Sequence, residues 1–504
     1  MSKILSLEDL KKKLDLLRQK KKKIVLCHGV FDLVHPGHIN HFKSAKKFGD
    51  ILVVSITADH FINKGHNRPL FNSENRRKIL SEMTVIDFVC ESQSSDAVSI
   101  IEKLKPDIYC KGPDFKNKKK DLTKKIQKEI KAIKKVGGKF KTTSDQTFSS
   151  SKIINTINKD LTIQDKFLSK VNKKFTKDKI YKILDSFDKL KILVLGESII
   201  DEYVFCETLG KSGKEPVLTM KPYDTKRFLG GSLAVCNHLS TFCKKVSLIS
   251  YLGEKNEEHN FIKKNLSKNI STHFINKVNS PTIIKKRFIE GVNKIKVLGI
   301  YSINDDLVNN RNEVKLYNLI KKKIKEHDLI IICDYGHGLI NKKISNLIIN
   351  SKKPYTLNAQ INSSNTGHHT LDKFSKMLGI VINANELRHE FRDNSSSIAE
   401  LAKKLQKKAK TQNILVTSGS DGASLIYRNE VHNAPAFAKQ VVDKIGAGDS
   451  MLALVSLCIK KDIDKDLTLY LGSLASAHTV ENVSNSSPID KNYIKKIISH
   501  QLLN

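Results

Sequence analysis

The segment with the clearest chemical potential runs from Asp443 to Ser450 and reads Asp-Lys-Ile-Gly-Ala-Gly-Asp-Ser. An apolar run follows, Met451 to Ile459, which we expect to form a buried helix. Gly446, Ala447 and Gly448 leave backbone N–H groups unshielded at the start of that helix, where the helix dipole favours an anion. These three residues form an anion-binding nest. The carboxylate of Asp449 comes next, so it can accept a proton from a hydroxyl while the nest holds a phosphoryl group. A tight turn before a helix is the ordinary reading of two glycines alone.

A second group of candidate residues lies near the N-terminus, after a predicted buried strand from Ile24 to Cys27. The loop carries Phe31 and Asp32, and then His35-Pro36-Gly37-His38 leads into a helix that begins near Gly37. Histidines three residues apart across a helix start place both rings on one side, near the positive end of the helix. Imidazoles there can bind phosphate oxygens and stabilise the charge that develops in phosphoryl or nucleotidyl transfer. We expect three apolar residues of this helix to face the core: Ile39, Phe42 and Ala45.

These motifs need elements that position them, and the N-terminal part alternates predicted strands with predicted helices from Ile24 to Ile157. This order predicts a doubly wound parallel sheet with its ligand at the carboxyl ends of the strands. Lys111 follows one of those strands. Ser149, Ser150 and Ser151 open the last predicted helix, where hydroxyl and N–H groups can contact phosphate. A second domain begins at the strand Lys191 to Glu197, after an amphipathic helical connection.

Composition bounds the class of protein. The chain has 504 residues, 39% of them hydrophobic and 28% charged, which is typical of two to four globular domains. The segment from Met1 to Lys23 is polar, and no apolar run reaches the length of a membrane span, so we expect a cytoplasmic protein without a membrane partner. Eight scattered cysteines with no CxxC pair favour buried free thiols over disulfides or a zinc site.

The net charge of +36 raises the alternative of a nucleic-acid-binding protein. Only ten of the 88 basic residues are arginine, and the lysines are spread along the whole chain. Nucleic-acid readers concentrate positive charge and use arginine and aromatic residues. We therefore expect no specific nucleic-acid partner, and a field that favours small anions such as nucleotides and sugar phosphates.

Two family resemblances rest on these motifs. Asp443 to Ser450 resembles the signature of ribokinase-like (PfkB) sugar kinases, and His35 to His38 resembles the HxGH signature of cytidylyltransferase-like nucleotidyltransferases. Together with the Lys111 segment and the serine helix, the chain resembles the bifunctional heptose-7-phosphate kinase / heptose-1-phosphate adenylyltransferase family over residues 24–157 and 191–490. The resemblance implies an α/β chain with a Rossmann-like nucleotidyltransferase domain at 1–160, a helical connection at 161–190 and a ribokinase-like kinase domain at 191–504.

The resemblance also implies roles for individual residues. In the kinase part, Asp449 is the base, the nest stabilises developing charge, and Asn383 and Glu386 hold Mg²⁺, through water. Substrate contacts are implied for Asp201, Gly230, Gly231, Lys286 and Arg287. In the other part, His35 and His38 are catalytic. Nucleotide or phosphate contacts are implied there for Phe31, Asp32, Lys111, Ser149, Ser150 and Ser151, again with Mg²⁺.

The function implied is bifunctional. ATP phosphorylates a sugar phosphate similar to heptose 7-phosphate, and a nucleotide is then joined to a sugar 1-phosphate to give an ADP-heptose-like product for lipopolysaccharide. Two features depart from the family: Ala234 stands where the kinases carry an asparagine, and the nucleotidyltransferase part precedes the kinase part. Another sugar or polyol phosphate with CTP, a single active domain, and a homo-oligomer all remain open.

Overall fold

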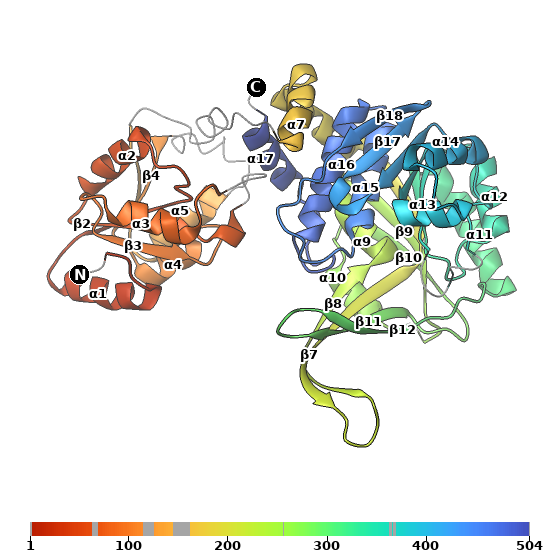
Figure 1. Ribbon diagram of the computed structural model, residues 1–504, viewed down its shortest axis with the longest axis horizontal. Helices are drawn as coiled ribbons and strands as arrows, with labels where there is room; N and C mark the ends of the chain where they lie inside the picture. The colour runs from red at the N-terminus through yellow and green to blue at the C-terminus, as the bar shows by residue number, and fades with distance from the viewer. Residues whose placement is uncertain are drawn as a thin grey trace. The chain divides into compact units, whose positions relative to one another are not determined.

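The computed structural model describes residues 3–62, 69–113, 125–144, 162–255, 257–361, 365 and 369–502, so Ser149, Ser150 and Ser151 lie outside the described residues. The chain forms two compact units (Figure 1). The smaller consists of Met1–Thr162 with Lys495–Asn504, and the larger of Ile163–Ile494. The predicted helical connection contributes α7 (Ile163–Lys174) and α8 (Lys177–Ser186), which both cluster with the larger unit.

The smaller unit is built on a parallel sheet in the order β3-β2-β1-β4-β5. The first strand lies at the centre, and the chain moves outward first to one side and then to the other. This is the doubly wound arrangement that the alternation of elements predicted. The strands are β1 (Ile24–Gly29), β2 (Ile51–Thr57), β3 (Phe88–Ser92), β4 (Ile108–Lys111) and β5 (Lys139–Thr142).

Helices cover both faces of this sheet, because its buried strands carry apolar side chains on each side. One core packs α1, α4 and α5 against the sheet, and the other packs α2 and α3. The helices are α1 (Leu7–Gln19), α2 (Pro36–Lys46), α3 (Ser73–Ser81), α4 (Val98–Leu104) and α5 (Lys125–Lys135).

Helix α2 begins where the sequence predicted, but one of its inward residues was assigned wrongly. Phe42 and Ala45 are buried, whereas Ile39 is 37% exposed and His41 is buried. Hydrophobicity alone favoured Ile39, but the stripe that faces the sheet passes through positions 38, 41, 42 and 45, at the spacing of successive helix turns. The helix therefore presents a histidine to the core.

The larger unit has a nine-stranded sheet in the order β10-β9-β6-β13-β14-β15-β16-β17-β18, parallel except for β17 and β18 at one edge. The seven consecutive parallel strands, β10 to β16 in this order, end at the same edge, which is where an open α/β sheet binds its ligand. The strands are β6 (Lys191–Gly196), β9 (Lys245–Leu252), β10 (Ile270–Asn276), β13 (Leu329–Asp334), β14 (Tyr355–Ala359), β15 (Gly379–Asn383), β16 (Asn413–Thr417), β17 (Ala423–Tyr427) and β18 (Glu430–Ala434).

A separate four-stranded sheet, called the outer sheet below, has the order β12-β11-β7-β8. Its long hairpin of β7 and β8 projects from the body of the unit (Figure 1). The strands are β7 (Ser198–Lys211), β8 (Leu218–Gly230), β11 (Ile283–Glu290) and β12 (Lys296–Ser302). Because β7 follows β6 almost directly, the outer sheet is anchored beside the carboxyl edge of the main sheet.

Helices flank both faces of the main sheet (Figure 1). The apolar run after Gly448 forms α15 as predicted, with ten consecutive buried residues. Packing on one face are α9 (Gly231–Ser240), α15 (Ala447–Lys460) and α16 (Lys465–Val480); on the other are α11 (Asn310–Lys325), α12 (Lys342–Asn350), α13 (Ala384–Phe391) and α14 (Ile398–Ala409). The unit also contains α10 (His259–Asn265), and α17 (Lys491–Gln501) ends the chain.

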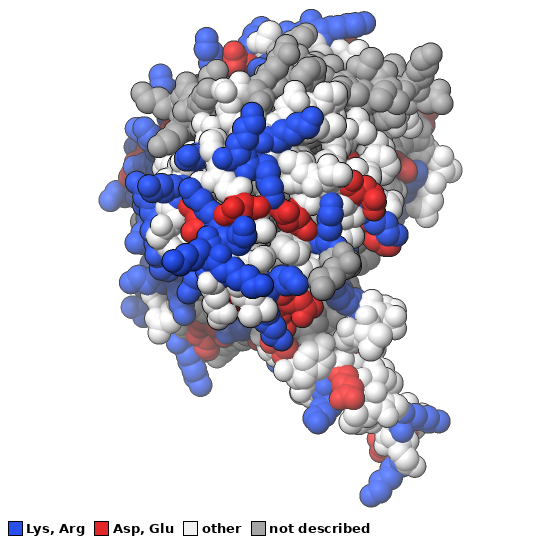
Figure 2. Space-filling view, turned by 90° about the vertical axis from the view of Figure 1, so that its left-hand side faces the viewer, with Lys and Arg blue, Asp and Glu red and all other residues white. Residues whose placement is uncertain are grey.

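Two surface properties bear on function. Within the described ranges, no helix combines the length and the apolar character needed to cross a membrane. Figure 2 shows lysine and arginine side chains spread over one face, with acidic side chains among them. A net charge of +36 distributed in this way gives a general attraction for small anions.

Candidate active sites

The larger unit contains a pocket of about 880 Å³ at the carboxyl ends of its parallel strands. The anion nest, the outer sheet and the loops after β13 to β16 all contribute to its lining. Predicted residues that line it are Asp201, Gly231, Arg287, Asn383, Glu386, Gly446, Ala447, Gly448 and Asp449. Residues far apart in the sequence thus meet in one cavity, which the nest and charged side chains of the outer sheet both line.

The nest has the backbone geometry that its glycines predicted. Gly446 caps α15 with a φ of 89°, in the left-handed region. A Cβ atom at this position would lie 2.1 Å from Oδ1 of Asn485, so both the conformation and the space require glycine. Gly448 has open space around it, and the helix start is accessible from the pocket. N–H groups at the start of this fourteen-residue helix therefore face a cavity large enough for a phosphoryl group.

Asp449 is held in place by Tyr335, whose hydroxyl donates to Oδ1 at 2.8 Å. Burial raises the pKa of Asp449 to about 7, against the opposing effects of the Tyr335 hydrogen bond and the Lys285 ammonium. A carboxyl with a pKa near neutrality can both take up and release a proton at physiological pH. The position and the basicity of Asp449 suit a general base.

The outer sheet contributes a paired carboxylate to the pocket lining. Asp201 on β7 accepts a hydrogen bond from Nη1 of Arg287 on the neighbouring β11, at 2.5 Å. A Cβ atom on Gly230 would lie 2.3 Å from Oδ2 of Asp201, so this glycine makes room for the carboxylate, but it is not among the described residues that line the pocket. Gly231 has a φ of 56° and does line the pocket.

The structure does not bring Lys286 to this pocket. Its ammonium lies 2.9 Å from Glu202, on the opposite face of the outer sheet. Lys285 lines the pocket instead, together with Arg287, because side chains alternate between the faces of a strand. Lys285 is only 7% exposed, and burial lowers its pKa.

Ala234, the departure from the family's asparagine, is buried in α9 and is not part of the pocket lining among the described residues. Asn237 does not replace that asparagine. Its side-chain amide donates to the carbonyl of Asn265, and its Oδ1 accepts from the N–H of Ser267. The missing amide is therefore not restored by a neighbour one helical turn away.

Asn383 and Glu386 line the pocket, but their spacing also has a structural explanation. Together they form a capping box at the start of α13: Asn383 caps the helix, and Glu386 accepts from the Asn383 N–H at 2.9 Å. Burial raises the pKa of Glu386 to about 7. A carboxylate offers about four acceptor sites, so after these backbone contacts Glu386 retains capacity for a hydrated cation. The pair fits water-mediated Mg²⁺ binding at the nest side of the pocket.

Asp443, the first residue of the nest segment, joins the nest to the outer sheet. It accepts from the Tyr203 hydroxyl on β7 and from the Lys296 ammonium on β12, each at 2.5 Å. Burial alone would raise the pKa of Asp443, but Lys296 and Tyr203 hold it below its usual value. This carboxylate ties two strands of the outer sheet to the loop that holds the anion nest.

In the smaller unit, the carboxyl ends of β1 and β4 carry the predicted nucleotidyltransferase residues. The rings of His35 and His38 are stacked with centroids 3.9 Å apart at the start of α2, as their spacing predicted. Phe31 has a φ of 48°, and its ring packs edge-on against His38. Burial lowers the pKa of His35. The two imidazoles therefore form a fixed pair at the positive end of a helix.

Asp32 and Lys111 have structural partners in this unit. Oδ1 of Asp32 accepts from the backbone N–H groups of Leu70 and Phe71. These bonds tether the segment before α3 to the loop after β1. The Lys111 ammonium donates to the His28 carbonyl at 3.1 Å and lies 3.7 Å from Glu129. Both residues stand at the expected edge of the sheet, where they shape the loop around the histidines.

Four residues that sequence reasoning did not assign help to build these sites: Lys285, Tyr335, Asn485 and Arg76. Arg76 is fully buried and donates to the carbonyls of Phe71, Val30 and Thr57. Its bond to Val30 helps to fix the loop between β1 and α2, which leads to the two histidines. Alternation along β11 could have identified Lys285. Nothing in the local sequence distinguishes the other three, because their contacts are made across distant parts of the chain.

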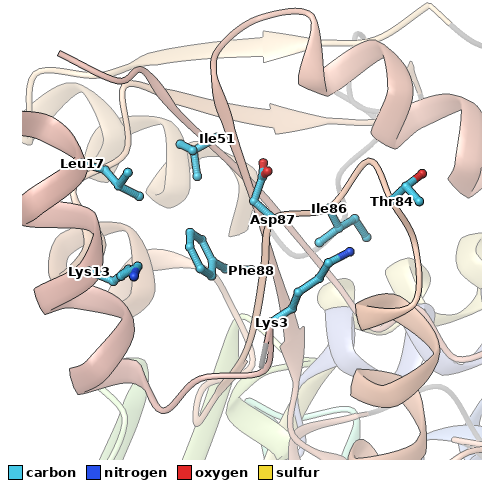
Figure 3. Close-up of a pocket in the computed structure, with 8 residues that line it drawn as sticks. All are labelled: Lys3, Lys13, Leu17, Ile51, Thr84, Ile86, Asp87 and Phe88. Atoms are coloured by element: carbon cyan, nitrogen blue, oxygen red, sulfur yellow. The ribbon is translucent and has the colours of Figure 1, made fainter. Parts of the chain in front are cut away.

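A smaller hollow of about 290 Å³ lies elsewhere in the smaller unit (Figure 3). Ile51 and Phe88 line it, and they are the first residues of β2 and β3. In a parallel sheet these amino ends lie opposite the carboxyl edge that carries His35 and His38. This hollow therefore belongs to neither candidate site.

Comparisons with known proteins cover both units. The sequence model described as pfkB family carbohydrate kinase matches residues 189–492, and the one described as cytidylyltransferase-like matches residues 26–156. The bifunctional protein HldE of a Nitratiruptor species is 27% identical over 301 residues, 58% of this chain and 62% of that protein. HldE of Desulfatibacillum aliphaticivorans is 41% identical over 117 residues, 23% of this chain and 24% of that protein. Each match thus spans less than two thirds of the relative.

Among solved structures, phosphofructokinase-2 from Escherichia coli in complex with substrates and products superposes with a TM-score of 0.50 and 13% identity. It covers 62% of this chain and 100% of that structure. The same enzyme in complex with fructose-6-phosphate also gives a TM-score of 0.50, at 12% identity. At these identities the likeness concerns the fold alone, and it is the ribokinase-like fold that the sequence predicted.

Proposed function

The chain belongs to the pfkB family of carbohydrate kinases, and we propose that its larger unit transfers the γ-phosphoryl group of ATP to a hydroxyl of a sugar phosphate. One observation carries the proposal. Asp449, the anion nest at the start of α15, and the cationic pair Lys285 and Arg287 all line a single pocket. A base, a phosphoryl-binding nest and a site for a second anion are the parts this transfer needs.

The chain's own residues divide the work. Asp449 takes the proton of the attacking hydroxyl, and its pKa of about 7 keeps it available as a base at neutral pH. N–H groups of Gly446, Ala447 and Gly448 stabilise the charge that builds on the transferred group. Asn383 and Glu386 would hold a hydrated Mg²⁺, which neutralises phosphate charge when bound.

The phosphate that the sugar substrate already carries, as distinct from the γ-phosphoryl group of ATP, defines the proposed substrate class. Lys285 and Arg287 project from β11 on the same face, next to Asp201. Asp201 partly neutralises Arg287 and also interacts with Lys285, so two cations share one carboxylate at this part of the pocket. We propose that Asp201 binds sugar hydroxyls while Lys285 and Arg287 bind the phosphate of a heptose 7-phosphate-like substrate. Another sugar or polyol phosphate satisfies the same charge pattern and is the alternative.

For the smaller unit we propose nucleotidyl transfer to a sugar 1-phosphate, with His35 and His38 stabilising the charge of the transferred group. The stacked pair at the start of α2 supports this role. We propose ATP as the nucleotide and an ADP-heptose-like product because the sequence motifs resemble those of heptose-1-phosphate adenylyltransferases; CTP is the alternative nucleotide. Ser149, Ser150 and Ser151 are retained as proposed phosphate contacts.

We also propose that the protein is a homo-oligomer through its outer sheet. Every residue of the edge strand β12 is exposed, and three of these are large apolar side chains: Val297, Leu298 and Ile300. Such an apolar sheet edge favours association. Light scattering coupled to gel filtration measures the assembly directly.

The two activities are tested with a substrate panel on the full-length protein. ADP release is followed with ATP, Mg²⁺ and either heptose 7-phosphate, other sugar phosphates, or the same sugars without phosphate. Pyrophosphate release is followed separately with ATP or CTP and sugar 1-phosphates. ADP release that requires a phosphorylated sugar supports the kinase proposal, whereas turnover of free sugars alone contradicts the assigned substrate class.

A further inference from the structure

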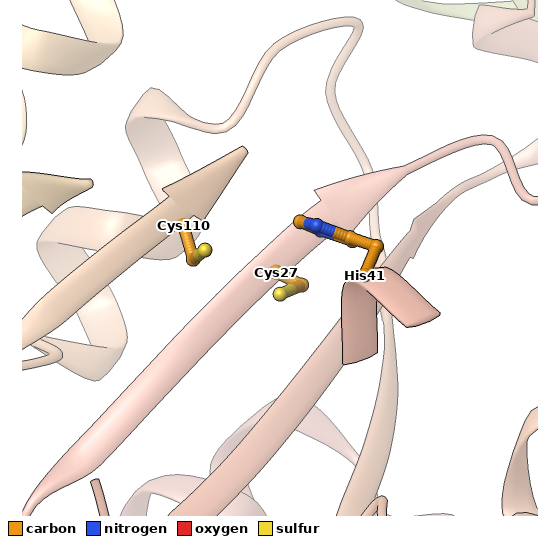
Figure 4. A group of neighbouring side chains, drawn as sticks. All are labelled: Cys27, His41 and Cys110. Atoms are coloured by element: carbon orange, nitrogen blue, oxygen red, sulfur yellow. The ribbon is translucent and has the colours of Figure 1, made fainter. Parts of the chain in front are cut away.

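Two thiols and an imidazole meet in the core of the smaller unit (Figure 4). The residues are Cys27 on β1, Cys110 on β4 and His41 on α2, and all three are buried. One nitrogen or sulfur atom from each lies within 4.8 Å of those of the other two. These are the ligand types of soft divalent metals, above all zinc.

Secondary structure explains why the three groups meet. Cys27 and Cys110 are paired residues on adjacent parallel strands, so their side chains project from the same face. The buried stripe of α2 passes over that face and brings His41 onto the two sulfur atoms. The ligands come from three separate elements, so no CxxC motif or similar local spacing in the sequence indicates them.

We propose that Cys27, Cys110 and His41 form a site for Zn²⁺ or a chemically similar divalent ion, with water as the fourth ligand. Typical zinc bonds to sulfur and nitrogen imply ligand atoms roughly 3.8 Å apart in a tetrahedron. The observed limit of 4.8 Å requires the side chains to close by about 1 Å, within the reach of χ1 rotation.

Charge balance favours this ion in a buried position. Each thiol releases one proton to solvent when its sulfur binds the metal, so two thiolates and one Zn²⁺ sum to zero. A neutral cluster avoids the large cost of burying a net charge. Without the ion, burial raises the pKa of the Cys27 thiol, and the neighbouring Cys110 adds to the effect.

The surroundings also orient the histidine. Thr143 is buried, and its hydroxyl lies 3.1 Å from Nδ1 of His41. Metal-binding histidines are usually fixed by such a partner on the ring. Among the described residues of this unit, Cys90 is the remaining cysteine; it is also buried but belongs to the opposite core. This makes Cys90 a matched control for substitution.

The metal would join three elements that carry the proposed nucleotidyltransferase residues. β1 leads into the loop with Phe31, β4 ends at Lys111, and α2 holds His38 one turn before His41. Binding would therefore stabilise the smaller unit and fix the histidine helix against the sheet. It requires nothing from the larger unit, so kinase activity should not depend on it.

The test measures metal in the full-length protein purified under reducing conditions from cells grown with Zn²⁺ or Co²⁺. We expect close to one ion per chain, and for Co²⁺ the thiolate charge-transfer absorption of a tetrahedral site. Cys27→Val, Cys110→Val and His41→Phe should each lose more affinity than the roughly 10–100-fold cost of removing an outer-shell partner. Cys90→Val should keep the ion and its spectrum.

Other results overturn the proposal. Wild-type protein without stoichiometric metal after growth with either ion contradicts the proposal. Metal binding as tight as in the wild-type protein in all three ligand variants contradicts it too. A mass two hydrogens below that of the reduced chain, with Cys27 and Cys110 in one cross-linked peptide, would indicate a disulfide in place of the metal. If a variant is unstable, kinase turnover shows whether the larger unit is folded. The cobalt spectrum shows whether the metal site still forms.

Discussion

Lys285 offers a sharp test of the kinase site, because its neighbour in the sequence is a natural control. Lys285→Met keeps the length of the side chain and removes its ammonium from the pocket. Lys286→Met makes the same change one residue later, on the opposite face of β11, where the ammonium is paired with Glu202. The two variants thus have the same composition and differ only in the face from which the charge is lost.

The magnitude follows from burial. Lys285 is 7% exposed, so a phosphate bound to it would be shielded from water on the protein side. A hydrogen bond to a charged partner contributes about 1.5–3 kcal/mol, which corresponds to a loss of roughly 10- to 200-fold in kcat/KM for a sugar phosphate. The Lys286 side chain is 40% exposed, and loss of a surface ion pair worth about 0–1 kcal/mol should change kcat/KM by no more than about fivefold.

The assay measures kcat/KM by ADP release with a phosphorylated sugar and with the same sugar lacking phosphate. At about pH 8, above the pKa of Asp449, Lys285→Met should lose activity on the phosphorylated substrate only. A second readout is the pH profile: the Lys285 ammonium lowers the pKa of Asp449, so its removal should move the acidic limb to higher pH. Equal effects of the two variants, or an equal loss on both sugars, would refute the assignment of Lys285 to the substrate phosphate.

Two further predictions concern the nest and its base. Because burial raises the pKa of Asp449 to about 7 and only the deprotonated form accepts a proton, kinase kcat/KM should rise about tenfold from pH 6 to pH 8; a rate that falls over this range would contradict the role of Asp449. Gly446→Ala forces a Cβ to within 2.1 Å of Asn485 and adds about 1–2 kcal/mol of left-handed strain, so kinase kcat should fall at least about tenfold while pyrophosphate release is unchanged. Gly213→Ala, where a Cβ meets open space, is the control. A comparable loss of kinase kcat in that variant would contradict the role assigned to the nest.

Much of the fold could be predicted because strong local patterns and tertiary structure agree. The apolar strand-and-helix alternation of the N-terminal part gave the doubly wound sheet, and the glycines before Asp449 correctly marked the start of α15. Parallel strands gather their carboxyl ends at one edge, so motifs at strand ends were expected to share a site. In the larger unit the nest and the Asn383–Glu386 segment do line the same pocket.

What could not be predicted depends on faces and on distant contacts. Choosing Lys286 over Lys285 ignored the alternation of a strand, and choosing Ile39 over His41 gave hydrophobicity more weight than helical phase. Asn383 and Glu386 show a different limit, since one spacing serves both a capping box and a cation site. The meeting of Cys27, Cys110 and His41 required the register of β1 and β4, which no single segment encodes.

The central claim is that this chain carries two independent transferase sites, and one experiment tests it most directly. Both activities are measured on the wild-type protein, Asp449→Asn and His38→Ala. Loss of a general base should lower sugar phosphorylation by about 10²–10⁴-fold in Asp449→Asn and leave pyrophosphate release intact. His38→Ala should show the reverse, and thermal unfolding checks that the substituted unit of each variant is folded, because the retained activity reports only the other unit. If either substitution removes both activities from a folded protein, or neither activity responds to its own substitution, the two-site account is wrong.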